Sequence, residues 1–419
     1  MSDTGEEALV VVGAGQAGAE TAVAVRQAGY RGSITLVGEE DHAPYQRPPL
    51  SKSLLSERAT FDDVRIRAPR AYESADVRLV AGARVVAVHR ARQQVELQDG
   101  RRLPYTALAL ATGGRPRRLP WADDVGAWSL HTLEDAWRVR ADLRPGVRLL
   151  VVGGGFIGLE AAAAATARGV VVTLVEARSR LLERTCPAAV ADFLGGVHRS
   201  HGVDVRTGVT VVQAHRTSTG VTVALDDGTT LVVDHVLVGI GQVPNEELAR
   251  TAGLTVQDGI VVDERARTSD PQIVAAGDCT RQRHGHLGVV VRLESQQNAT
   301  DQARIAARTI CGLPPAPPSV PTFWSDQHEH RLQIAGVASN GDQEVLRGRP
   351  EHGSFCVLTV QGDRLTSIHA VNSPRDHAAG RRLLARHGRL DPTAAADAAA
   401  PLTGLDPAPT DRSAPRCPQ

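Results

Sequence analysis

Several absences restrict what this chain can be. Lys plus Arg equals Asp plus Glu at 47 each, so no overall field attracts nucleic acid or an anionic membrane surface. No apolar stretch approaches the roughly 20 residues that span a bilayer. The opening residues, MSDTGEEALVVVG, have neither the basic start nor the apolar length of a signal peptide. We therefore expect a soluble, cytoplasmic protein without a nucleic-acid or membrane partner, whose docking charges are local.

Paired cysteines are also missing. The five cysteines are scattered, with no two at the spacing of a redox dithiol or a zinc knuckle: Cys186, Cys279, Cys311, Cys356 and Cys417. We therefore expect neither a disulfide framework nor an internal cysteine relay.

Lysine is almost absent. Lys52 is the only one, while arginine occurs throughout. A position that keeps lysine in such a chain indicates a need for a compact ammonium, which the planar fork of arginine cannot imitate. The alternative is an exposed lysine that survives by chance.

Two stretches repeat one order of elements, strand, glycine loop, helix and strand. The first runs from Leu9 to Val37, and the second runs from Arg148 to Glu176. Each glycine loop has the spacing G-x-G-x-x-G, with Gly13, Gly15 and Gly18 in the first and Gly153, Gly155 and Gly158 in the second. The pattern predicts an α/β protein with two Rossmann-like domains, and 419 residues suffice for two or three domains.

The two loops indicate two bound dinucleotides. Backbone N–H groups and a helix N-terminus meet a pyrophosphate there, and an acidic residue after the second strand accepts hydrogen bonds from a ribose. Glu39 and Glu176 hold these positions. The economical pair of ligands is a tightly held flavin, FAD, with a diffusible nicotinamide cofactor. Glu176 favours NADH over NADPH by charge repulsion, although Arg178 and Arg180 can soften that preference.

The remaining stretches suggest further pieces. Short strands with Asp-Gly turns at Asp99 and Asp227 indicate a β-meander in each nucleotide unit. The Pro-rich run 313–321 separates a third segment of strands and a basic helix, and from Asp391 the composition predicts a disordered tail.

Six motifs carry a resemblance to a known family: PYQRPPLSK from Pro44, ATGGRP from Ala111, GGGFIGLE from Gly153, AAGD ending at Asp278, RLESQQNA from Arg292 and FWSDQ from Phe323. Together they resemble the FAD-dependent NADH:ferredoxin reductases of oxygenase systems, in order, over about residues 9–390. The resemblance implies an FAD domain at 1–115 and 240–318, a NAD domain at 116–239, an α+β C-terminal interface domain at 319–390 and a tail at 391–419.

The resemblance also implies site residues. FAD contacts fall on Gly13, Gly15, Ala17, Gly18, Glu39, Arg47, Lys52, Val85, Thr112, Gly113, His131, Asp278, Glu294, Gln296 and Trp324. NAD contacts fall on Gly153, Gly155, Phe156, Ile157, Gly158, Glu160, Glu176, Arg184 and Gly241. Lys52 and Glu160, on the first turn of the second nucleotide helix, form the catalytic pair near the nicotinamide. The helix near Glu294 directs its N-terminus at the flavin, and Trp324 lies near the flavin unless it is an ordinary core tryptophan.

Two features depart from the family pattern. His131 stands where the family usually has an arginine, so that this FAD contact is expected to weaken or to depend on pH. The pairs His328 with His330 and His284 with His286 have H-x-H spacing but no third ligand nearby, so we expect surface histidines and no metal.

The expected function is transfer of electrons from NADH through FAD to a small iron–sulphur ferredoxin that feeds a cytochrome monooxygenase or a ring-hydroxylating dioxygenase. The protein is expected to be a monomer or a weak dimer. One alternative acceptor is oxygen, a quinone or semidehydroascorbate. Another function is that of a signalling flavoprotein resembling apoptosis-inducing factor, whose DNA binding is disfavoured by the zero net charge. The missing cysteine pair disfavours a disulfide reductase.

Overall fold

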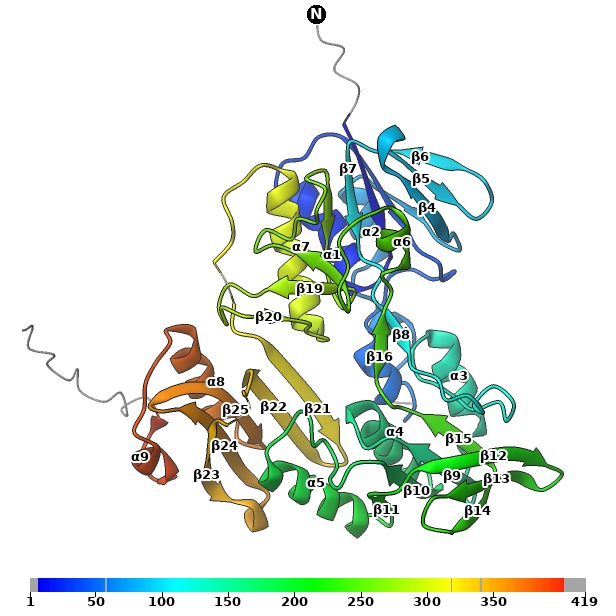
Figure 1. Cartoon of the computed structure of the whole chain (residues 1–419), viewed down its shortest axis with the longest axis vertical. Coiled ribbons are helices and arrows are strands. Elements are labelled where there is room, and N and C mark those ends of the chain that lie inside the picture. The colour runs from blue at the N-terminus through cyan, green and yellow to red at the C-terminus, as the bar shows by residue number, and fades with distance from the viewer. Residues whose placement is uncertain (1–6, 57–58, 318, 340, 403–419) are drawn as a thin grey trace, which may run out of the picture. The chain divides into compact units, whose positions relative to one another are not determined.

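The structure is a computed structural model that describes residues 7–56, 59–317, 319–339 and 341–402 (Figure 1). It divides into two compact units. The first comprises Met1–Glu183, Leu194–Ser319 and Asp326–His328, and the second comprises Arg184–Phe193, Val320–Ser325 and Glu329–Gln419.

The first unit contains a parallel five-stranded sheet in the order β18-β7-β1-β2-β3. Its strands are β1 (Ala8–Val12), β2 (Ser33–Val37), β3 (Val77–Val80), β7 (Ala107–Leu110) and β18 (Ile273–Ala275). Alternate residues of β1 enter different cores. Leu9 and Val11 pack with Ala22 of helix α1 (Gln16–Gln27), whereas Val10 and Val12 pack with the meander β4 (Val85–His89), β5 (Gln94–Leu97) and β6 (Arg102–Pro104). The apolar run of β1 is therefore buried on both faces.

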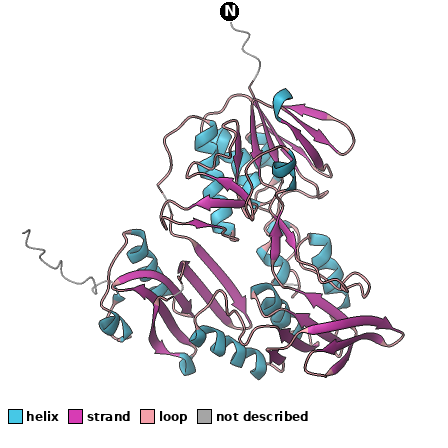
Figure 2. Cartoon of the chain, viewed as in Figure 1, coloured by secondary structure: helices cyan, strands magenta, loops and turns pink. Residues whose placement is uncertain are grey.

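The second βαβ stretch forms a parallel four-stranded sheet in the order β11-β10-β9-β15. The strands are β9 (Arg148–Val152), β10 (Val171–Glu176), β11 (Asp204–Thr207) and β15 (His235–Val238), and helix α4 (Phe156–Thr166) follows β9. A second meander accompanies this sheet, as Figure 2 shows, in β12 (Val211–Thr217), β13 (Gly220–Leu225) and β14 (Thr230–Val233). The two expected meanders are both present.

Short elements complete the first unit. The antiparallel strands β8 (Gly114–Pro116) and β16 (Gln242–Pro244) pair where the chain passes from one sheet to the other and returns. Helix α3 begins at a capping box in which the Thr132 hydroxyl accepts the Asp135 N–H. The helices of this unit that remain are α2 (Pro69–Ser74), α3 (Leu133–Asp142), α5 (Ala188–Ser200), α6 (Glu247–Thr251) and α7 (Gln296–Ile310), and α5 begins in the second unit. The remaining strands are β17 (Ile260–Val262), β19 (Thr280–Arg283) and β20 (Val290–Val291). There are also 3-10 turns at Pro48–Ser51, Asp62–Val64 and Arg90–Arg92.

The second unit is an α+β layer built on a sheet in the order β21-β22-β25-β24-β23. The elements are β21 (Thr322–Gln327), which ends in the first unit, β22 (His330–Gly336), β23 (Gln343–Arg349), β24 (Ser354–Gln361), β25 (Arg364–Val371), α8 (Pro374–Ala385), α9 (Pro392–Ala396) and a 3-10 turn Pro350–His352. Buried residues of β24 and β25 share a core with Leu383 and Leu384 of α8.

The expected tail from Asp391 is wrong at its start. Helix α9 follows Asp391, and Ala395 and Leu402 are buried in the core of the second unit. The physical reason is Arg347, which is only 3% exposed and donates to the carbonyls of Ala395, Ala398 and Ala400. These long-range hydrogen bonds satisfy a backbone whose composition alone predicts disorder. The rest of the expected tail, 403–419, lies outside the described residues.

The expectation of surface histidines is wrong for His284 and His286, which are 8% and 7% exposed. The turn after β19 folds inward here, and His284 Nδ1 accepts the Leu287 N–H. In the described part of the chain no three His, Cys, Asp or Glu side chains are grouped to hold a metal ion. Within the same residues, no helix is both long enough and apolar enough to cross a membrane.

Candidate active site

The first glycine loop joins β1 to α1. Gly13 has φ +103, and a Cβ there would lie 2.1 Å from the Ala111 carbonyl oxygen. A Cβ at Gly18 would lie 1.8 Å from the Gly13 oxygen, so this glycine lets the helix approach the loop. Gly15 differs, because its backbone is extended and a Cβ would meet no described protein atom within 4 Å. Neither conformation nor packing of the chain requires glycine there, which fits a ligand that approaches the helix N-terminus.

The second loop, between β9 and α4, has the same division of roles. Gly153 has φ +111, and its Cβ would lie 2.5 Å from the Gly239 oxygen, while a Cβ at Gly158 would lie 2.1 Å from the Gly153 oxygen. At Gly155 the nearest atom would be 4.0 Å away, again with extended backbone. Both loops therefore have the shape that a dinucleotide pyrophosphate needs.

The two acidic residues lie beyond the strands that follow these loops. Glu39 follows β2, and its carboxylate is 3.7 Å from Arg84 and mostly exposed. Glu176 is the last residue of β10. Its carboxylate accepts the Gly154 N–H at 2.7 Å and the Arg178 N–H at 2.8 Å. Glu176 is therefore positioned beside its loop, where an NAD-type ribose places its hydroxyl groups, whereas the described contact of Glu39 is with Arg84.

Lys52 and Glu160 form an ion pair inside the first unit. Lys52 Nζ is 2.9 Å from Glu160 Oε1, and the side chains are only 17% and 4% exposed. Ser51 donates its hydroxyl to Glu160 Oε2 at 2.5 Å, so both carboxylate oxygens have a partner. Helix α4 begins at Phe156, which places Glu160 in the second turn rather than in the expected first turn. The only lysine is thus not an exposed relic of composition.

Arg47 lies in a polar group with Glu40 and His131. Its guanidinium donates to Glu40 Oε1 at 2.8 Å and to the His131 carbonyl. Burial, and then the charge of Arg47, lower the pKa of His131 to about 3. The imidazole is therefore neutral at ordinary pH, and the weakened or pH-dependent FAD contact expected at this position stays a prediction.

Asp278 lies at the end of the turn after β18. Burial raises the pKa of its carboxyl to about 6, against a hydrogen bond from the Gln242 amide at 2.9 Å, and Glu294 adds to the rise. Thr112 donates its hydroxyl to the Asn245 carbonyl at 2.6 Å, and the Asn245 amide donates to the Thr112 carbonyl at 2.9 Å. These bonds fix the loop 112–113 against the returning chain.

The N-terminus of α7 is anchored by its cap. The Ser295 hydroxyl accepts the Asn298 N–H at 3.1 Å. Gln296 donates to Gln16 at the start of α1 (3.1 Å) and to Gln46 (3.2 Å). The first glycine loop, the segment before Lys52 and the start of α7 therefore meet around one glutamine, which favours an anionic or carbonyl-bearing ligand near this helix end.

The other expected residues are distributed as follows. Ala17 and Val85 are buried. Ile157 is 45% exposed and follows Phe156 on the first turn of α4. Gly113 and Gly241 have positive φ, and the Glu294 carboxylate accepts a hydrogen bond from Arg292. Arg184 and Trp324 belong to the second unit.

Sequence reasoning missed four polar residues that support this site. Ser51, Gln242 and Asn245 contact expected site residues, and Gln302, 2% exposed, accepts the Gly277 N–H at 2.7 Å beside Asp278. Only Ser51 had a signal, because it lies within the motif PYQRPPLSK. The other three lie in no glycine loop, and their partners are distant in sequence.

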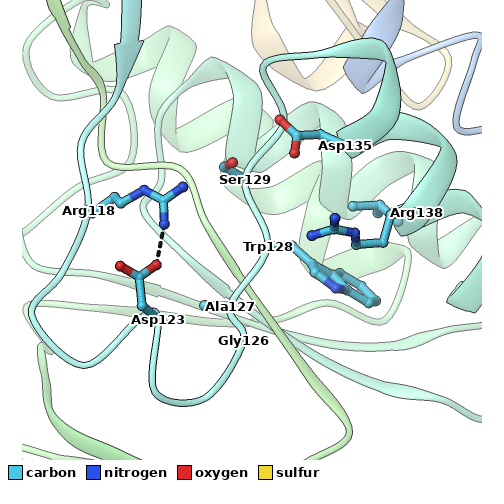
Figure 3. Close-up of a pocket in the computed structure, with 9 residues that line it drawn as sticks. Arg118, Asp123, Gly126, Ala127, Trp128, Ser129, Asp135 and Arg138 are labelled. Atoms are coloured by element: carbon cyan, nitrogen blue, oxygen red, sulfur yellow. Dashed lines mark hydrogen bonds and ion pairs between the residues drawn. The ribbon is translucent and has the colours of Figure 1, made fainter.

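A surface pocket of the first unit lies elsewhere. Figure 3 shows Trp128 and Arg138 at its wall and the ion pair of Arg118 with Asp123 at its rim. None of the expected nucleotide-binding residues lines it. The backbone of Trp128 in its lining bonds to Val236 and Val238, and we assign the pocket no role in the active site.

Comparison with known proteins agrees with this geometry. Residues 7–303 match the family model described as pyridine nucleotide-disulphide oxidoreductase, and residues 322–405 match the model described as reductase C-terminal. The chain is 43% identical to putidaredoxin reductase of Pseudomonas putida over 94% of this chain and 95% of that protein. It is 43% identical to rhodocoxin reductase of Rhodococcus erythropolis, covering 93% and 92%.

A solved structure is similar over the same extent. The crystal structure of a covalent putidaredoxin reductase–putidaredoxin complex matches with a TM-score of 0.91 and 41% identity, covering 94% of this chain and 97% of that one. The α/β fold with two Rossmann-like domains and the cofactors FAD and NAD(H) expected from the sequence are thereby confirmed. The chain belongs to the pyridine nucleotide-disulphide oxidoreductase family, among the ferredoxin reductases of oxygenase systems.

Proposed function

We propose that the chain transfers electrons from NADH through FAD to a small iron–sulphur ferredoxin that serves an oxygenase. The observation that carries the proposal is the ion pair of Lys52 with Glu160. The segment before Lys52 is joined to the first glycine loop by Gln296, which donates to both Gln46 and Gln16, and Glu160 lies on the helix that the second loop begins. This ion pair thus connects the parts of the chain that carry the two dinucleotide-binding loops.

Bound FAD supplies the ability to accept two electrons together and to release them singly. The residues of the chain do the rest. The Lys52 ammonium stabilises negative charge near it, and the N-terminus of α7 adds a partial positive charge. Glu160, held by Ser51, fixes the direction of the ammonium. Gly155 and Glu176, at the second glycine loop, would hold the nicotinamide cofactor.

The cysteines favour a ferredoxin over a disulfide as acceptor. Cys279, Cys311 and Cys356 form no disulfide in the part of the chain that the structure describes. Burial raises the pKa of Cys356 to about 12 and also raises the pKa of Cys279, so neither thiol forms the reactive thiolate readily. These observations disfavour a relay through a dithiol formed by Cys279, Cys311 and Cys356, and favour a more direct passage of electrons to the acceptor.

One pair of measurements tests the proposal. The purified protein is expected to contain FAD, to lose its flavin absorbance on addition of NADH, and to reduce an oxygenase ferredoxin much faster than oxygen, a quinone or semidehydroascorbate. Equal turnover with and without ferredoxin would favour a small oxidant as acceptor. A change of assembly with NADH, without turnover, would favour a signalling flavoprotein.

Finer points belong to the same proposal. We place the FAD domain at 1–115 and 240–318, the NAD domain at 116–239 and the interface domain from 319, and extend the latter to 402 because α9 and Leu402 pack in it. NADH is preferred to NADPH because Glu176 accepts ribose hydroxyls and repels a 2′-phosphate. Changing Glu176 to Gln should bring the kcat/KM for NADPH closer to the kcat/KM for NADH. An unchanged ratio of the two would contradict the assignment of Glu176 as the residue that sets the preference.

A further inference from the structure

The segment after β10 turns back to the second glycine loop. The Leu182 N–H donates to the Gly154 carbonyl at 3.0 Å, and Glu176 bonds both Gly154 and Arg178 through its two oxygens. Residues 178–183 therefore form one wall of the place where the adenosine ribose of the nicotinamide cofactor is expected.

Three side chains of this wall form a closed group. Arg178 Nη1 donates to Glu183 Oε1 at 3.2 Å, and the Ser179 hydroxyl donates to Glu183 Oε2 at 2.8 Å. The Ser179 bond, followed by the Arg178 bond and charge, lowers the pKa of Glu183, so that its carboxyl is ionised at neutral pH.

Arginine and serine are the side chains that bind phosphate well. The guanidinium supplies a fork of N–H donors, and a hydroxyl supplies one more. In Rossmann domains an arginine near the end of the second strand accommodates the 2′-phosphate of NADPH. Here both groups are present two and three residues beyond Glu176, yet both already donate to a carboxylate of this chain.

We infer that Glu183 is a specificity-determining residue, which occupies Arg178 and Ser179 and thereby closes a latent 2′-phosphate site. The inference rests on the proposed role of the second glycine loop as the NAD site. Glu183 acts twice, because it engages the donors and adds a negative charge beside the phosphate position. Two acids, Glu176 and Glu183, thus exclude NADPH, and only the first is visible from sequence spacing.

A role in stability does not account for this group. Arg178 is 50% exposed and Glu183 is 29% exposed. Exposed ion pairs typically contribute about 0–1 kcal/mol. Loss of the Glu183 charge should therefore leave the fold intact and change mainly the binding of an anionic ligand.

The test measures binding of NADP+ and NAD+ to the FAD-loaded protein by titration calorimetry. Glu183→Gln should lower the Kd for NADP+ by about three- to tenfold, the range that one freed charged donor gives, and change the Kd for NAD+ by less than about twofold. The gain should disappear in the double variant Arg178→Gln with Glu183→Gln. Steady-state NADPH to NADH ratios should move in parallel.

Asp204→Asn is the matched control. Asp204 also pairs with a neighbouring arginine, Arg206, at 2.9 Å, and the substitution removes the same charge from β11, the strand that pairs with β10. It should leave the Kd for NADP+ nearly unchanged. An equal gain with Asp204→Asn would reduce the effect to net charge and overturn the inference.

Two other results would also overturn it: no gain for NADP+ with Glu183→Gln, or a gain that survives loss of Arg178. In both cases normal NAD+ binding would leave the proposed function standing. Failure of the unaltered protein to bind either nucleotide would instead contradict the proposed function.

Discussion

Replacing Lys52 by Met removes the cation of a buried pair and tests the centre of the active site. At a separation of 2.9 Å, the Coulomb energy of Lys52 with Glu160 is about 6 kcal/mol at an effective dielectric constant near 20. Removing one partner of a buried pair typically costs about 3–5 kcal/mol, because the remaining charge stays desolvated. Ser51 keeps its bond to Glu160 and offsets part of this, so we expect Lys52→Met to lower the free energy of unfolding by about 2–4 kcal/mol.

The second partner behaves differently. Glu160→Gln leaves an ammonium that is 17% exposed and has a flexible stem that can turn toward water, so its cost should be smaller, about 1–2 kcal/mol. In the double variant no uncompensated charge remains, and it should be more stable than Lys52→Met alone. Urea unfolding of the four proteins, followed by circular dichroism with comparison of the slopes, gives the coupling energy, which should be on the order of 2 kcal/mol.

The same variants separate stability from catalysis. In the flavin-loaded proteins, Lys52→Met should slow reduction by NADH by roughly ten- to a thousand-fold, because a few kcal/mol of charge stabilisation is lost. Lys52→Arg keeps the charge in a larger fork and should recover part of the rate. Additive stabilities in the cycle, together with reduction at the parental rate in Lys52→Met, would refute the reasoning.

Three further predictions concern other parts of the chain. Replacing Cys279, Cys311 and Cys356 by Ala should leave NADH-dependent dye reduction within a few-fold of the parent, and loss of turnover in a folded, FAD-loaded variant would restore a cysteine relay. The pKa of Asp278, raised to about 6, implies stability that is present below about pH 4 and lost as the pH rises through 6. Unfolding of the FAD-free protein should show this loss, about 2–3 kcal/mol, and Asp278→Asn should remove it; an unchanged slope with pH would exclude Asp278 as its source. Arg347→Met should expose the segment after Asp391 to proteolysis, since the carbonyls of Ala395, Asp397, Ala398 and Ala400 lose their donor; unchanged protection would show that apolar packing alone holds it.

Short sequence patterns predicted the two βαβ units of the fold. The apolar runs of β1 and β9 and the glycine spacings identified both βαβ units, because strand, turn and helix N-terminus are specified within a few residues. The pair of Lys52 with Glu160 came from the family resemblance and from the rarity of lysine. No spacing rule joins two residues so far apart, and the Ser51 bond, across 109 positions, went unseen for the same reason.

The errors had long-range causes as well. The segment after Asp391 is poor in large apolar residues, and what orders it is Arg347, a residue of a strand more than 40 positions earlier. His284 and His286 lie in a polar stretch whose inward fold depends on the rest of the unit. Composition describes only the residues of a segment, whereas the order of that segment also depends on its hydrogen bonds and packing with distant parts of the chain.

Substitutions at Gly15 and Gly155 should separate folding of the chain from binding of its two cofactors. Because an added methyl group would meet open space in both loops, Gly15→Ala should fold normally while obstructing FAD, whereas the same change at Gly13 or Gly18 would strike the backbone. Gly155→Ala should give a yellow protein that dithionite bleaches but NADH does not. The two substitutions would thus give two inactive forms of the protein, one that is folded but lacks FAD and one that holds FAD but is not reduced by NADH.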